Sequence, residues 1–154
     1  MKKPPGLDRT ATRRAVTVLS VSPIEEDQAC LQGIFTHSNW TLHSALTLVS
    51  ALDILRDHEV SVVLCERDLR PGTWKDLLEQ ITPMLDPPVL VVASRLADER
   101  LWAEALNWGV YDVLAKPYDT QEVLRVVSSA WRHWKVQHQL PGGVPEAYKA
   151  AAAG

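Results

Sequence analysis

Three polar residues that could do chemistry together each stand at or just after the end of an apolar run of strand length. They are Glu66, Ser94 and Lys116, and the Ser22-Pro23 step follows another such run. A carboxylate, a hydroxyl and an ammonium group are side chains that both phosphoryl transfer and buried ion pairing can use. The elements that carry these residues decide whether they meet.

Other site chemistries have little support in the sequence. The five histidines show neither metal-ligand spacing nor a Ser/His/Asp arrangement. Cys30 and Cys65 form no CxxC motif, and we interpret both as reduced core residues. The stretch 22–26 after the first apolar run contains acids and no glycine, which argues against a phosphate-binding loop. We expect no metal site, no cofactor and no enzyme activity.

Length and composition indicate one globular domain. The chain has 154 residues, 46% hydrophobic and 23% charged, with a net charge of −3. That charge gives no reason to expect a nucleic-acid partner, and no apolar run approaches the ~18 residues of a membrane span. We predict a cytoplasmic protein with no membrane association, with tails at 1–14 and 138–154 flanking one domain at 15–137.

The domain alternates strand-like and helix-like segments. The five predicted strands are Ala15 to Val21, Trp40 to Ala45, Val60 to Cys65, Pro88 to Ala93 and Tyr111 to Ala115. The five predicted helices are Ile24 to Thr36, Leu46 to Asp57, Thr73 to Leu85, Ala97 to Trp108 and Thr120 to Gln137. Continuous Val and Leu in the third and fourth strands indicates a sheet covered on both faces. Strict alternation then predicts an α/β fold with a doubly wound parallel sheet.

Three of the helix starts carry capping patterns. Ser22-Pro23-Ile24-Glu25 has proline at the expected first helical position, and Thr73 to Asp76 and Asp119 to Glu122 have the spacing of a capping box. We therefore expect Ser22 to cap a helix. First-turn acids such as Glu25 and Glu26 are expected to face the helix dipole and solvent.

Four ordered motifs resemble the receiver domain of response regulators, of the CheY-like superfamily, across about residues 15–135. They are Val18-Leu19-Ser20-Val21, then 63–69 with Gly72, then 88–94, and finally Gly109 through Lys116-Pro117-Tyr118. The last is the most specific, because Gly-x-x-Asp-x-Leu-x-Lys-Pro-Tyr closely matches the family's fifth strand and Lys-Pro step. The resemblance implies a flavodoxin-like (βα)5 fold with chemistry at the carboxyl ends of the strands.

The resemblance also assigns roles to individual residues. It places Glu66 at the phosphoacceptor position, Ser94 at the switch hydroxyl and Lys116 at the lysine that binds the phosphoryl group. Pro117 is a candidate for a cis peptide bond that directs Lys116 to the site.

Several parts of the family's phosphorylation site are missing. The acidic pair that holds Mg²⁺ maps to Ser22 and Pro23, which offer no carboxylate, so we do not expect Mg²⁺ binding. Glu66 is one methylene longer than aspartate, and a misplacement of ~1 Å can cost about 100-fold in rate. The aromatic switch position maps to Val113, which cannot swing between buried and exposed positions. Without the acidic pair, Glu66 can form an ion pair with Lys116 directly.

Asp68 is the rival phosphoacceptor. It lies two residues later, on the turn, whereas Glu66 keeps Leu69 and Gly72 at the family's spacing. Aromatic residues expected around the partner-binding surface are Trp102, Tyr111 and Tyr118. Trp102 is expected to be exposed, and Trp108, Trp131 and Trp134 to pack in the core.

The sequence thus predicts a degenerate receiver domain in two-component signalling. It would act by binding a signalling protein such as a histidine kinase or another regulator, without normal phosphorylation. Glu66 would be either a mimic of the phosphorylated state or inert. One alternative is a conventional phosphorelay receiver that uses Asp68 or Glu66, and another is a flavodoxin-like cofactor binder. A homodimer, the partner and the pathway stay open.

Overall fold

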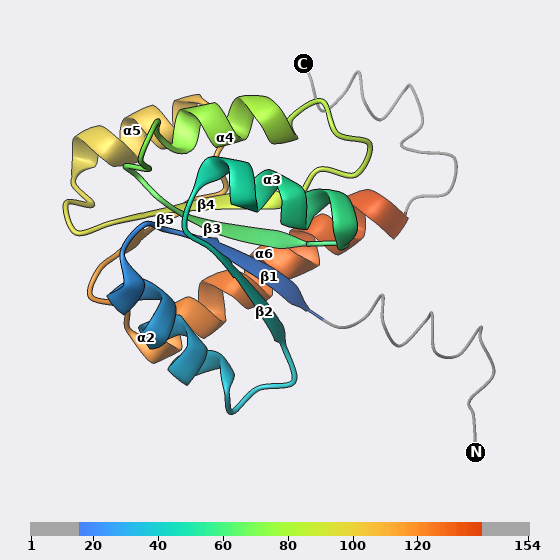
Figure 1. Cartoon of the computed structure of the whole chain (residues 1–154), viewed down its shortest axis with the longest axis horizontal. Coiled ribbons are helices and arrows are strands. Elements are labelled where there is room, and N and C mark those ends of the chain that lie inside the picture. The colour runs from blue at the N-terminus through green and yellow to red at the C-terminus, as the bar shows by residue number, and fades with distance from the viewer. Residues whose placement is uncertain (1–15, 140–154) are drawn as a thin grey trace.

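The computed structural model describes residues 16–139, which fold around one five-stranded parallel sheet (Figure 1). The strand order is β2-β1-β3-β4-β5. The strands are β1 (Thr17–Val21), β2 (Thr41–Ala45), β3 (Val62–Glu66), β4 (Val89–Ser94) and β5 (Asp112–Ala115). The predicted doubly wound, flavodoxin-like fold is therefore confirmed.

Helices cover both faces of this sheet. Within residues 16–139 they are α2 (Glu25–Phe35), α3 (Leu48–Asp57), α4 (Trp74–Ile81), α5 (Glu99–Asn107) and α6 (Thr120–Gln139). One core cluster joins the sheet to α3, α4 and α5, and a second joins it to α2 and α6. Figure 1 shows these two layers on opposite sides of the strands.

The strand sequences explain why both faces are covered. In β3, Val63 and Cys65 contribute to the first core cluster, while Val62 and Leu64 contribute to the second. Alternate side chains of a strand point to opposite faces, so a strand of continuous apolar residues needs partners on both sides.

The expectations about the start of α2 and about Cys30 are wrong. Helix α2 begins at Glu25, and its N-cap position is Ile24, which has no side-chain cap. Ser22 instead accepts a hydrogen bond from the Ile24 amide at 3.1 Å and donates to Asp27. Cys30 is exposed and not a core residue, because it lies on the outer face of α2.

The other predicted caps are present. Thr73 and Asp76 form a complete capping box at the start of α4, and the Asp119 carboxylate accepts a hydrogen bond from the Glu122 amide. The predicted tails lie almost entirely outside the described residues. None of the described helices combines the length and hydropathy of a membrane span.

The turn before α4 depends on Gly72, and substitution of this residue tests the fold. Gly72 has φ of 93°, and a Cβ there would lie 2.7 Å from Asp76 Oδ2 in the capping box. Gly72→Ala should lower the free energy of unfolding by about 1–2 kcal/mol, because the left-handed conformation is unfavourable for L-residues. Urea denaturation measures this change.

Gly33 provides the matched control. It lies within α2, and no atom lies within 4 Å of a Cβ added there. Gly33→Ala should raise the free energy of unfolding by about 0.5–1 kcal/mol, because alanine is the better helix former. Equal effects of the two substitutions would contradict the described turn.

Candidate functional site

The predicted site residues meet at one edge of the sheet. Glu66 and Ser94 are the last residues of β3 and β4, and Ser22 and Lys116 directly follow β1 and β5. Parallel strands end at the same edge, so adjacency of β1, β3, β4 and β5 brings these four residues into one region. All four are buried.

The centre of this region is the Lys116 ammonium group. Its Nζ contacts Glu66 Oε1 and Asp27 Oδ2, and only 2% of the Lys116 side chain is exposed. The two carboxylate side chains are each 8% exposed. The structure therefore contains a buried cluster of one cation between two carboxylates, which we call the Lys116 cluster: Asp27, Glu66 and Lys116.

Further hydrogen bonds fix both carboxylates. Glu66 Oε2 accepts the Asp68 amide at 2.9 Å, while Glu66 Oε1 faces Lys116. Asp27 Oδ2 also accepts the Ser22 hydroxyl at 2.8 Å. Hydrogen bonds to the charged form stabilise a buried carboxylate, so the Asp68 amide and the Ser22 hydroxyl stabilise the two carboxylates of the cluster in addition to Lys116.

Asp27 was missed by the sequence analysis, which expected an uncontested pair between Glu66 and Lys116. The signal was its spacing, because Asp27, Leu31 and Phe35 follow one another at intervals of four and are the buried residues of α2. Glu25 and Glu26 are exposed as expected, whereas Asp27 lies on the helix face that packs on the sheet.

Ser94 lies at the same edge, but its hydroxyl is not part of the hydrogen bonding of the Lys116 cluster. Its hydroxyl oxygen accepts the Leu96 amide at 3.0 Å. The Ser94 carbonyl accepts the Lys116 amide at 3.0 Å, but within residues 16–139 the Ser94 hydroxyl has no hydrogen bond to Glu66 or to the Lys116 ammonium group. The Lys116-Pro117 peptide bond is cis, and Val113 is buried in the core.

Asp68 is directed away from the cluster. Its carboxylate accepts hydrogen bonds from Arg67 Nε at 3.1 Å and from the terminal guanidinium nitrogen at 2.9 Å. The side chain is 59% exposed. The hydrogen bond to Asp68 raises the pKa of Arg67. In this arrangement Asp68 has no contact with the lysine that the resemblance assigns to phosphoryl binding.

The donor groups at this edge do not fit the Mg²⁺ ion that the family binds. Pro23 has no polar side-chain atom, and the Ser22 hydroxyl donates its hydrogen to Asp27. Both carboxylates of the cluster contact the Lys116 ammonium group. Mg²⁺ needs several oxygen ligands in octahedral geometry, so it would have to compete with a built-in cation.

Neighbouring groups add no further negative charge. Burial raises the pKa of the Tyr118 hydroxyl, and the charges of Asp27 and Glu66 raise it further. Burial likewise raises the pKa of the Cys65 thiol, with Glu66 contributing. Both groups stay neutral at pH 7. Lys116 Nζ lies 5.9 Å from the centre of the Tyr118 ring.

The aromatic residues expected at a partner surface lie in different environments. Trp102 on α5 is 38% exposed, whereas Tyr111 is partly buried and its hydroxyl lies 2.6 Å from Ser129 Oγ on α6. Tyr118 is partly buried beside Lys116. Trp108, expected in the core, is 44% exposed; it directly follows the end of α5 and packs edge-on against Trp74.

Sequence comparison finds relatives among signalling proteins. No family model matches the chain. The aerobic respiration control sensor protein ArcB of Escherichia coli strain K12 is 27% identical over 122 residues, covering 76% of this chain and 15% of ArcB. The ArcB protein of Shigella flexneri gives the same figures. The chain therefore spans about 15% of the length of the curated relatives it matches.

Comparison of structures finds receiver domains. The signal receiver domain of an HD domain-containing protein from Pseudomonas fluorescens Pf-5 gives a TM-score of 0.73 at 29% identity, covering 80% of this chain and 99% of that chain. A response regulator receiver domain protein from Clostridium thermocellum gives a TM-score of 0.71 at 15% identity, covering 79% of this chain and 98% of that chain. The structural neighbours are response regulator receiver domains, and the comparisons support a receiver domain of the two-component kind.

The Lys116 cluster predicts unequal effects of removing its charges. Lys116→Met leaves two buried carboxylates facing each other and should cost about 3–5 kcal/mol of unfolding free energy. Glu66→Gln leaves Lys116 paired with Asp27 and should cost less. The double substitution should cost less than the sum, with a coupling of at least ~0.5 kcal/mol. Urea denaturation of all four proteins measures the cycle.

The exposed pair of Lys75 and Glu104, with an N–O distance of 2.6 Å, is the matched control. The cycle of Lys75→Met and Glu104→Gln should give a smaller coupling, because exposed pairs contribute little. Additive effects at Glu66 and Lys116 would contradict the buried contact.

Proposed function

We propose that this chain is a receiver domain that works without phosphorylation, by presenting one fixed surface to a protein partner. The observation that carries this proposal is the position of Lys116, buried between the carboxylates of Glu66 and Asp27. The lysine that a phosphorylatable receiver keeps for an incoming phosphoryl group is here neutralised by the protein itself.

The electrostatics of the cluster support a permanently occupied site. An incoming phosphoryl group would have to displace two carboxylates from a buried ammonium group, and each displaced charge would lose its partner. Breaking a buried pair costs about 3–5 kcal/mol when one partner is left uncompensated. Glu66 is also held by the Asp68 amide, so it is poorly placed to attack a phosphorus atom in line.

The hydrogen bonding of Ser94 bears on how Glu66 acts. A carboxylate that imitated the phosphorylated state would hold both Lys116 and the switch hydroxyl. Glu66 contacts Lys116, but within residues 16–139 it has no hydrogen bond to the Ser94 hydroxyl, whose oxygen accepts the Leu96 amide. Val113 at the aromatic switch position is buried and too small to act as a switch. We therefore propose that Glu66 holds Lys116 permanently and so keeps the carboxyl edge of the sheet in one conformation.

The partner we propose is a signalling protein of the two-component kind. ArcB is a sensor protein, and the region of similarity is a small part of it. Receiver domains bind kinases and other regulators, and a histidine kinase or a second regulator would suit a domain that has no enzymatic step of its own. Trp102 on α5 is an exposed aromatic side chain that such a contact could cover.

Incubation with acetyl phosphate and Mg²⁺, followed by intact-mass measurement, tests the proposal. We expect no stable phosphoryl adduct, because Lys116 is occupied and Ser22 and Pro23 offer no metal ligand. The matched variant carries Ser22→Asp, Pro23→Asp, Asp27→Asn and Glu66→Asp, which restores the family's acids and frees Lys116 from Asp27. That variant should gain an adduct.

A phosphoryl group on Glu66 or Asp68 of the unaltered chain would overturn the proposal. It would favour the conventional phosphorelay receiver, and peptide mapping would show which of the two residues carries the group.

The effect of Mg²⁺ on the thermal stability of the domain is a second test. Millimolar Mg²⁺ should leave the thermal midpoint of the unaltered chain nearly unchanged, since ligand stabilisation follows RT ln(1 + [L]/Kd) and Lys116 occupies the carboxylates. Lys116→Met should show a rise in midpoint with Mg²⁺, because Asp27 and Glu66 are then free to bind a cation. Saturable sub-millimolar binding by the unaltered chain would contradict the ion-pair argument.

A further inference from the structure

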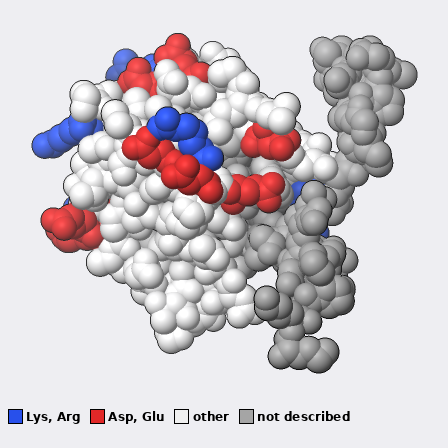
Figure 2. Space-filling view, turned by 45° about the vertical axis from the view of Figure 1, so that its right-hand side comes forward, with Lys and Arg blue, Asp and Glu red and all other residues white. Residues whose placement is uncertain are grey.

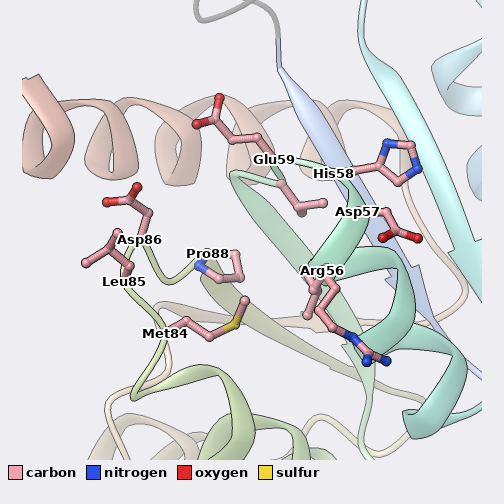
Figure 3. A pocket seen from close by; sticks show the side chains of 10 residues that line it. Arg56, Asp57, His58, Glu59, Met84, Leu85, Asp86 and Pro88 are labelled. Carbon is pink, nitrogen blue, oxygen red and sulfur yellow. The ribbon is translucent and has the colours of Figure 1, made fainter.

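A cavity of about 320 Å³ opens at the amino edge of the sheet, opposite the Lys116 cluster (Figure 3). It lies between the end of α3, the loop that leads into β3 and the loop that leads into β4. Its walls are formed by Leu55, Arg56, Asp57, His58, Glu59, Val60, Met84, Leu85, Asp86 and Pro88. The receiver site described above uses none of these residues.

The cavity combines an apolar floor with acidic sides. Leu55, Met84 and Pro88 supply apolar surface, and Leu85 at its rim is 94% exposed. In Figure 3, Glu59 and Asp86 lie toward one end of the cavity, and Asp57 lies toward the other. A segment that carried apolar and basic side chains would match both properties.

The basic groups in the wall leave an excess of negative charge. Arg56 is paired with Asp53 outside the cavity, and the wall residue His58 stacks on His43. His138, which is not a wall residue, lies 3.2 Å from Asp86. Asp57 and Glu59 take part in no ion pair within residues 16–139. Figure 2, which turns the right-hand side of Figure 1 forward, shows carboxylates grouped around a small basic patch on the surface.

The chain itself contains a segment of complementary chemistry. Residues 1–14 carry the five basic residues Lys2, Lys3, Arg9, Arg13 and Arg14 against the single acid Asp8, so their net charge is 5 − 1 = +4. The same segment includes Pro4, Pro5 and Leu7. Its composition therefore pairs apolar with basic side chains, as the cavity pairs apolar with acidic ones.

The point where this segment joins the domain is next to the cavity. Ser61 directly follows the wall residue Val60, and its amide donates to the Thr17 carbonyl at 3.0 Å. The Ser61 hydroxyl also donates to the same carbonyl at 3.0 Å. Extended chain spans about 3.3 Å per residue, so even a few residues before Val16 can cross a cavity of this size.

We propose that the acidic cavity at the amino edge binds residues 1–14 of the same chain. The basic side chains of the segment lie against Asp57, Glu59 and Asp86, and its apolar residues cover Leu85 and Met84. Attachment at Val16 gives the segment a high effective concentration at the cavity, so a weak contact is enough to occupy it. The opposite edge of the sheet is left free, and this inference is independent of the proposed function.

Paramagnetic broadening in the full chain tests the inference. A nitroxide is attached at Gly6→Cys in a Cys30→Ser background, because Cys30 is exposed while Cys65 is buried and its thiol pKa is raised. We expect backbone amide signals of residues 55–60 and 84–86 to lose more intensity than those at the carboxyl edge. The preference should fade when salt is raised from about 0.1 M to 1 M, where the Debye length falls from about 10 Å to about 3 Å.

Charge variants make the result specific. Asp57→Asn, Glu59→Gln and Asp86→Asn together should abolish the preferential broadening. Glu25→Gln, Glu26→Gln and Glu99→Gln together remove three acids from other helix starts and should leave the broadening intact. Equal broadening in both variants, no preference for the cavity, or broadening that occurs only between labelled and isotope-enriched copies would overturn the proposal.

Discussion

The burial of the Lys116 ammonium group between two carboxylates is the constraint on which the carboxyl edge of this domain depends. Each of the three charges would be strongly unfavourable alone in a poorly solvated place, so both carboxylates need Lys116 in position and Lys116 needs at least one carboxylate. Glu66 ends β3, Lys116 follows β5, and Asp27 lies in the first turn of α2. The contact therefore ties a helix to two non-adjacent strands and makes their relative positions a condition of stability.

Hydrogen bonds around α2 show how the rest of the fold holds this helix in the position that the Lys116 cluster requires. Asp27 accepts the Ser22 hydroxyl, and Gln28 on the next position donates to the carbonyls of Ser22 and Ala45, both at 3.1 Å. These contacts fix the start of α2 against the ends of β1 and β2. Leu31 and Phe35 then anchor the helix on the sheet through apolar packing. The polar residues at the start of this helix face and the apolar residues along the rest of it thus both hold α2 in its position on the sheet.

How far the sequence predicts this structure depends on the range of the interactions involved. Strand and helix order follows from local periodicity, and the caps at Thr73 and Asp119 follow from short patterns that act within one turn. Glu66, Ser94 and Lys116 could be placed because parallel strands end at a common edge. Asp27 could not be placed by the same rule, since it lies on a helix and a first-turn acid also suits solvent. The exposure of Trp108 likewise depends on how α4 and α5 pack, which no local pattern specifies.

The position of Asp27 suggests how, under the proposed function, a receiver fold could keep its architecture without metal ligation. In the family that this chain resembles, a cation balances the carboxylates at the end of the first and third strands. Here the loop after β1 carries Ser22 and Pro23, and the second carboxylate of the edge comes from α2. Lys116 takes the place of the metal as the charge that both carboxylates face. A lysine is covalently attached and cannot dissociate as a metal ion can. Under the proposed function, an edge balanced in this way would therefore stay occupied and would not switch between an occupied and an unoccupied state.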